Sequence, residues 1–178
     1  VGSPKSGKAA KMAAEWELVF AEEQYTNKWE PYAIKTAART LADQDAIGKK
    51  LEAEKDKAYN MYVALLKYEV AEYTMAAYVR GGNIQYEYGQ KLADAPLPIP
   101  LQNPKNEAAA ATYQTKLDAS VQKYRDVAKG EWLKVVDSAK KGGISNKWSR
   151  AAMESLGREF PGEFQALRQE LVQGTEAP

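Results

Sequence analysis

The chain has neither histidine nor cysteine among its 178 residues. This excludes the usual zinc sites, thiolate-bound clusters, thiol nucleophiles and Ser-His triads, because each of them needs one of these side chains. The chemistry that remains is a carboxylate-only metal site or a carboxylate-pair hydrolase. We therefore expect no catalytic, cofactor-binding or metal-binding residues. The absence of cysteine fits the cytoplasm and an oxidising cell envelope equally well.

The chain also lacks an excess of charge of one sign and a long apolar run. Lys plus Arg number 25 and Asp plus Glu number 24, which leaves a formal net charge of +1. Non-specific attraction to nucleic acid or anionic lipid needs a concentrated basic field. No run approaches the roughly 20 apolar residues of a membrane-spanning helix. We expect no nucleic-acid partner and no direct membrane insertion.

A hydrophobic content of 44% is that of an ordinary globular domain with a buried core. We expect residues 1–5 to be a disordered or vector-derived tail, residues 6–172 a single helical-repeat domain, and residues 173–178 a frayed tail. Residues 2–9 come close to the phosphate-binding motif G-x-x-x-x-G-K-[ST]. However, Ala9 replaces the hydroxyl that would hold Mg²⁺, and no strand precedes it. We interpret this near-match as chance.

Apolar residues recur at the helical period throughout, and strand-like alternation is nearly absent. The first helix is predicted over residues 6–28. The stripe expected to face the core consists of Ala9, Met12, Ala13, Trp16, Val19 and Phe20. A second helix is predicted over residues 31–43, because Pro31 suits a first helical turn. A third is predicted from Asp45, with a turn after Leu66, since a helix continuing to Asp94 would span about 75 Å.

The next predicted helix contains two adjacent glycines, Gly81 and Gly82. Each interior glycine costs about 1 kcal/mol relative to alanine. The pair therefore predicts either a close approach of another helix or a kink. Residues 95–104 then hold four of the eight prolines, which forbid helix and predict an ordered surface crossover in extended conformation.

A long helix is predicted from Asn106 and should end at Gly142 or Gly143 in the left-handed conformation. Ser145 or Asn146 should cap the next helix, which runs to about Leu156. A short last helix should begin at Pro161; its apolar residues are Phe164, Leu167 and Leu171. All four tryptophans, Trp16, Trp29, Trp132 and Trp148, are expected in the core.

These elements predict an all-α fold of about seven helices, and short connections make consecutive helices antiparallel neighbours. The layout resembles tetratricopeptide-repeat and related α-solenoid proteins, in which antiparallel helical hairpins stack side by side. Three motifs are more specific: Ala95-Pro96-Leu97-Pro98, Asn146-Lys147-Trp148-Ser149-Arg150 and Phe160-Pro161. In this order they are similar to the C-terminal part of envelope repeat proteins of gliding, myxobacterial-type bacteria. The resemblance covers roughly the last 100 residues. It departs at Gly81-Gly82, where one glycine is usual.

This kinship implies a scaffold in the bacterial periplasm or cell envelope, linked to surface motility machinery; the cytoplasm is the alternative location. Stacked hairpins form a concave surface that binds a protein or peptide. The function expected is therefore that of a non-enzymatic protein–protein interaction scaffold. The alternatives are a subunit that self-associates through exposed hairpin ends and, third, a carboxylate-based hydrolase.

Tyrosines supply the candidate binding residues, because a tyrosine offers rigid contact area and a polar tip. Of eleven tyrosines, seven fall within residues 59–88. The candidates for a protein-binding groove are Tyr62, Tyr73, Arg80, Tyr86 and Tyr88. Packing between helices is the alternative role for these side chains.

Two sets of charged residues are given no functional role. Residues 49–57 mix acidic and basic side chains and are expected to be solvated surface. Glu69 and Glu72 flank an apolar stripe, and a buried pair with Arg80 or Lys67 is one arrangement for them.

Overall fold

The computed structural model describes residues 7–165; most of them are helical and none lies in a strand. The α-helices are α1 (Gly7–Gln24), α2 (Leu41–Val63), α3 (Ala71–Ala93), α4 (Glu107–Gly142) and α5 (Lys147–Glu159). Four short helical segments join them: the π-helix η1 (Tyr25–Trp29) and the 3₁₀ segments η2 (Ala64–Tyr68), η3 (Ile99–Gln102) and η4 (Pro104–Asn106). The all-α prediction is confirmed, but the described residues hold five α-helices and one further helical turn rather than about seven helices. A helical turn begins at Pro161, whereas Leu167, Leu171 and the predicted tails lie outside the described residues.

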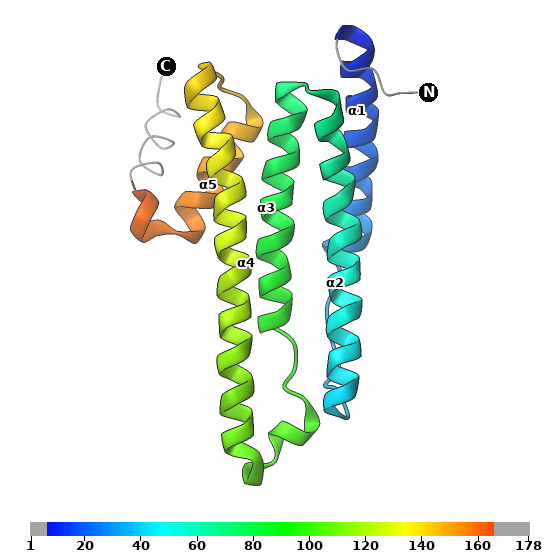
Figure 1. Cartoon of the computed structure of the whole chain (residues 1–178), viewed down its shortest axis with the longest axis vertical. Helices are drawn as coiled ribbons and strands as arrows, with labels where there is room; N and C mark the ends of the chain where they lie inside the picture. The colour runs from blue at the N-terminus through cyan, green and yellow to red at the C-terminus, as the bar shows by residue number, and fades with distance from the viewer. Residues whose placement is uncertain (1–6, 166–178) are drawn as a thin grey trace.

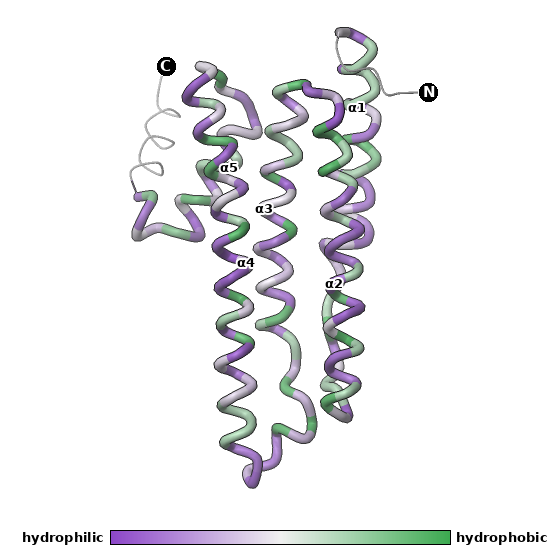
Figure 2. The backbone as a smooth tube through the Cα atoms, viewed as in Figure 1, coloured by the Kyte–Doolittle hydropathy of each residue, from purple (hydrophilic) through white to green (hydrophobic). Residues whose placement is uncertain are grey.

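The helices form an elongated array in which consecutive members run in opposite directions (Figure 1). The helix α3 is central and contacts α1, α2, α4 and α5. One core lies among α3, α4 and α5; a second lies among α1, η1, α2 and α3. Apolar and polar residues alternate along every helix, as amphipathic packing requires (Figure 2).

The predicted helix over residues 31–43 is wrong. The Thr40 hydroxyl accepts a hydrogen bond from the Asp43 amide at 3.0 Å, and the Asp43 carboxylate accepts one from the Thr40 amide at 3.1 Å. This capping box fixes the start of α2 at Leu41. The preceding segment stays irregular, and the Ala38 carbonyl accepts a bond from the Ile99 amide of the proline-rich crossover at 2.9 Å.

The turn predicted between Leu66 and Tyr73 is confirmed. Glu69 takes the left-handed conformation with φ of 55°, and its amide donates to the Leu66 carbonyl at 3.2 Å. The crossover at residues 95–104 also has no α-helix, as predicted, but it is folded into two 3₁₀ segments. It buries Pro98 and Leu101, which attach it to the array.

The glycine pair marks a close approach rather than a kink. A Cβ on Gly82 would lie 2.7 Å from Cδ1 of Trp132 on α4, and one on Gly81 would lie 3.0 Å from the Tyr59 ring. The Trp132 indole N–H donates to the Asn83 side chain at 3.1 Å. Glycine is needed at position 82 because the Trp132 indole occupies the space that a side chain would fill. The helix α3 continues unbroken through both glycines.

The hairpin between α4 and α5 follows the sequence closely. Gly143 adopts φ of 60° at the end of α4, the left-handed conformation that glycine takes without strain. The Asn146 side chain accepts bonds from the Trp148 and Ser149 amides, both at 2.9 Å, and caps α5. Trp148 is buried against the preceding helices, as predicted.

Candidate functional site: the outer face of α1 and the polar network beneath it

The helix α1 turns its large apolar side chains away from the core. Trp16 is 72% exposed, and Met12, Val19 and Phe20 are each more than half exposed. The prediction that these residues form the core stripe is wrong, and so is the prediction of a buried Trp16. We call this surface the α1 face; it comprises Ala9, Met12, Trp16, Val19 and Phe20.

Small residues form the buried side of α1 instead. Ala10, Ala14 and Ala21 are fully buried. Ala10 and Ala14 pack against tyrosines from η2 and α3, and Ala21 packs in the core shared with α2 and α3. The bulky tyrosines already fill the space between the helices, so only alanines fit at the contact. The sequence did contain this signal, because α1 has two apolar stripes, of which the described structure buries the one made of alanines.

The α1 face has the spacing of a helix-packing seam. Ala9, Met12, Trp16 and Val19 are separated by three, four and three residues. This is the spacing of the a and d positions of a coiled coil, where each side chain inserts between four residues of a facing helix. A stripe confined to a and d positions is narrower than the stripe of a helix that packs in a globular core. The α1 face therefore has the geometry to pair with one further helix.

A groove between α1 and α2 extends this surface. A cavity of about 620 Å³ is lined by Phe20 and Gln24 on α1, by Lys28 and Trp29 of η1, and by Ala58 and Met61 with other residues of α2. A second cavity of about 290 Å³ shares Phe20 and Met61 with the first. Phe20 lies beside the seam residue Val19 and also lines the groove, so the apolar surface continues from one helix to the next.

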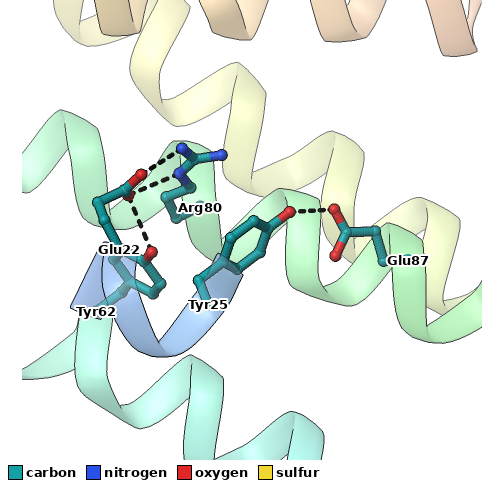
Figure 3. A network of polar contacts seen from close by, with 5 residues as sticks. All are labelled: Glu22, Tyr25, Tyr62, Arg80 and Glu87. Atoms are coloured by element: carbon teal, nitrogen blue, oxygen red, sulfur yellow. Dashed lines mark hydrogen bonds and ion pairs between the residues drawn. The ribbon is translucent and has the colours of Figure 1, made fainter. Parts of the chain in front are cut away.

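A partly buried polar network holds α1 in place beneath this face (Figure 3). The Glu22 carboxylate on α1 accepts hydrogen bonds from Arg80 Nε at 2.8 Å and from the Tyr62 hydroxyl at 2.9 Å, and it also accepts one from Arg80 Nη2. In η1, the Tyr25 hydroxyl and the Trp29 indole N–H donate to Glu87 on α3, the latter at 2.6 Å. These bonds tie α1 and η1 to both α2 and α3.

The electrostatics of the network favour neutral tyrosines. Burial raises the pKa of Tyr62 and of Tyr25 far above their usual value, and the carboxylates of Glu22 and Glu87 raise them further. Burial lowers the pKa of Arg80, but its hydrogen bond to Glu22 and the charge of Glu22 outweigh this and leave it raised. The tyrosines therefore remain hydrogen-bond donors at neutral pH, and the network acts as a fastening between helices.

Burial also affects the Glu87 carboxyl of this network. Burial raises the pKa of the Glu87 carboxyl, while the hydrogen bonds from Tyr25 and Trp29 oppose the shift. The Lys91 ammonium, whose pKa is lowered by burial, lies 5.0 Å above the Trp29 ring. Both groups belong to contacts between η1 and α3.

The structure separates the five predicted binding residues into distinct helix contacts. The side chains of Tyr62 and Arg80 come together because both donate hydrogen bonds to the Glu22 carboxylate. Tyr73 is buried beside the alanines of α1, Tyr86 donates its hydroxyl to Glu159 near α5, and Tyr88 meets the Tyr124 ring edge-on with centroids 4.5 Å apart. Sequence reasoning missed the α1 face because it assigned those residues to the core.

The remaining charged groups also differ from expectation. Glu69 and Glu72 are exposed; the partner of Arg80 is Glu22, and that of Lys67 is Glu17 at 2.9 Å. Within the run at residues 49–57, Lys55 is buried, and its ammonium lies 5.0 Å from the Tyr88 ring centroid. Its long apolar stem and the aromatic faces around it explain how a lysine is accommodated there.

Residues 7–165 contain no group of three or more Asp, Glu, His or Cys side chains placed to hold a metal ion. Over the same residues, none of the helices combines the length and the apolar character needed to cross a bilayer.

Comparison with known proteins gives no relative. No protein-family model, no curated protein and no solved structure matches this chain.

Proposed function

We propose that this protein is a non-enzymatic protein–protein interaction scaffold, and that its α1 face binds an amphipathic helix of a protein partner. The observation that carries the proposal is the exposure of four large apolar side chains on one helix: Met12, Trp16 and Val19 at seam spacing, and Phe20 beside them. A helix that packed only within its own chain would expose polar residues there.

The size of the α1 face supports this function. Aromatic side chains such as Trp16 and Phe20 bury about 150–250 Å² each, and together with the smaller Met12 and Val19 the exposed portions amount to on the order of 500 Å². Contiguous apolar patches on monomeric proteins reach about 300–600 Å², and the larger ones are often binding sites. The groove between α1 and α2 adds further apolar surface beside Phe20. A helix laid along α1 would remove this surface from water.

The network beneath the face prepares it for binding. Glu22 is held by Tyr62 and Arg80, and the start of η1 is held by Glu87. A helix fixed in this way loses little conformational freedom when a partner docks, which lowers the entropic cost of association. These polar contacts thus hold the α1 face in position for a partner, although they lie beneath the face and not on it.

The architecture and setting of the scaffold are part of the proposal. The central position of α3, with helices of alternating direction on both sides, supports a solenoid-like stack of hairpins of the tetratricopeptide type. The resemblance of the last hundred or so residues to envelope repeat proteins of gliding bacteria motivates a periplasmic or envelope location near the motility machinery. The cytoplasm is the alternative location.

Photo-crosslinking from the α1 face tests the proposed function. The photoreactive residue p-benzoyl-phenylalanine would replace Trp16 in one protein and the exposed Arg150 of α5 in a control. After irradiation in cells that express the protein, crosslinked peptides are identified by mass spectrometry. We expect position 16, and not position 150, to crosslink to a helix with apolar residues spaced three and four apart. Equal crosslinking from both positions, or none from position 16, contradicts the proposal.

A further inference from the structure

We infer that the helix bound by the α1 face is α1 of a second copy of this chain, in an antiparallel, two-fold symmetric dimer. This inference rests on the proposed function and names the partner. Each copy would place Met12, Trp16 and Val19 against the same residues of the other. A two-fold interface uses one surface on both subunits, so the surface must be complementary to itself.

The charges near the two ends of α1 meet this requirement in the antiparallel orientation, whereas the exposed Glu15 of each copy lies beside the axis and its repulsion weakens the dimer. Lys8 and Lys11 are exposed near the start of α1, and Glu23 is exposed near its end. Antiparallel pairing with Lys8 of one copy beside Glu23 of the other puts opposite charges together at both ends of the interface. Parallel pairing would put Glu23 of one copy against Glu23 of the other, because Glu23 continues the seam four residues after Val19. Charge pairs that flank a seam set the orientation of its helices.

The register follows from the same pair. The midpoint between Lys8 and Glu23 falls between Glu15 and Trp16, so the two-fold axis passes beside Trp16. The two indoles, the most exposed large side chains of the seam, then meet at the centre of the interface. Binding energy concentrates in central aromatic residues that a rim of other contacts shields from water.

The other end of the array shows why association is two-fold rather than head-to-tail. The outward residues of α5 are charged, and Lys147, Arg150, Glu154 and Arg158 are all exposed. Figure 1 places α1 and α5 on opposite sides of α3. Head-to-tail stacking would bury these charges under the α1 face at a large cost in solvation. The charged outer side of α5 therefore disfavours its pairing with the α1 face of another copy.

The area of the face fits a reversible dimer. The apolar part is on the order of 500 Å² per copy, and the flanking charged side chains extend it towards the roughly 800 Å² that each partner contributes to a standard interface. This is smaller than the interface of an obligate dimer, so dimerisation should depend on protein concentration.

Sedimentation equilibrium of the full chain tests the inference. We expect a monomer–dimer equilibrium for the wild type and a monomer for Trp16→Asp and, independently, for Phe20→Lys. Because both side chains are more than half exposed, circular dichroism should show unchanged helicity for each variant. Lys8→Glu should weaken dimerisation about tenfold, the effect of about 1.4 kcal/mol. The double variant Lys8→Glu/Glu23→Lys should restore it.

Cysteine crosslinking checks the orientation, since the chain has no cysteine of its own. Glu15→Cys lies beside the proposed axis and should form a disulfide-linked dimer on oxidation. Ala9→Cys is the control: its two copies would lie about 20 Å apart along antiparallel helices at 1.5 Å per residue, and should not crosslink. Crosslinking of both variants indicates a parallel pair and overturns the inference.

The outcomes separate this inference from the proposed function. A wild type that stays monomeric, or dimers that Trp16→Asp and Phe20→Lys leave intact, overturn the inference. If a monomeric wild type still crosslinks from position 16 to a helix of another protein, the proposed function stands and only the dimer is overturned. If position 16 crosslinks to nothing and the chain is monomeric, both are overturned.

Discussion

Among single residues, Gly82 shows how one missing side chain positions two helices. The indole of Trp132 fills the space where a Cβ of Gly82 would lie, and its N–H bonds to Asn83 in the next position of α3. Gly130 on α4 is also inside a helix, yet its Cβ would meet no atom within 4 Å. The same residue type therefore has opposite roles at the two sites.

Alanine at these two positions should have opposite effects on stability. Gly82→Ala should lower the free energy of unfolding by about 1–3 kcal/mol, the usual cost of overpacking a core. Gly130→Ala should raise it by up to about 1 kcal/mol, because alanine is the better helix former. Urea denaturation followed by circular dichroism measures both. Stabilisation by both substitutions would contradict the close contact between Gly82 and Trp132.

At the level of elements, α5 and α1 show that similar apolar patterns acquire different roles. Trp148 follows the Asn146 cap and is buried against α3 and α4. Trp16 lies mid-helix in an apolar stripe, yet it faces outwards. The difference lies in the neighbouring helices. The helix α5 buries Trp148 against α3 and α4, whereas α1 turns its alanines towards α3 and leaves Trp16 on the outside.

Replacement of each tryptophan by alanine measures this difference. Trp148→Ala should cost about 3–5 kcal/mol of unfolding free energy, as for other large core side chains. Trp16→Ala, the matched control, should stay within about 0.5 kcal/mol of the wild type, as for a surface substitution. Denaturation should be done at a protein concentration low enough to keep the chain monomeric. Comparable losses for the two variants would show that Trp16 is packed within its own subunit.

At the scale of the whole molecule, buried tyrosines make the free energy of unfolding fall as the pH becomes alkaline. The pKa values of Tyr25, Tyr62 and Tyr88 are all raised, chiefly by burial. The folded chain therefore keeps these protons above pH 10, where the unfolded chain loses them. Each raised pKa contributes stability that is fully present below about pH 10 and declines as the pH rises.

Tyr62→Phe isolates one of these contributions. Between about pH 10.5 and 11.5 the wild type should lose about 1.4 kcal/mol more unfolding free energy than Tyr62→Phe, the linkage slope for one proton per pH unit. Denaturant titrations at several pH values measure the difference. Between pH 7 and 9 the two proteins should show parallel pH dependence, which is the internal control. Parallel curves up to pH 11.5 would show that the Tyr62 proton is not held by the fold.

Local chemistry in the sequence determined the helices and most of their ends. The spacing of apolar residues predicted α1, α3, α4 and α5, and the Gly143 stop and the Asn146 cap needed only neighbouring residues. The start of α2 was also encoded locally, in the capping box of Thr40 and Asp43, but Pro31 offered a competing start. These features could be predicted because a helix end satisfies its backbone groups within one turn.

Only the tertiary structure decided which apolar stripe of α1 is buried. Both stripes have the helical period, and the choice depends on the space that the tyrosines of α2, η2 and α3 leave for Ala10, Ala14 and Ala21. The pairing of Glu22 with Arg80 was hidden for the same reason, since the two residues are far apart in the chain. Sequence fixes what each helix can bury, whereas the volumes and charges of distant helices determine what it does bury and what it leaves for a partner.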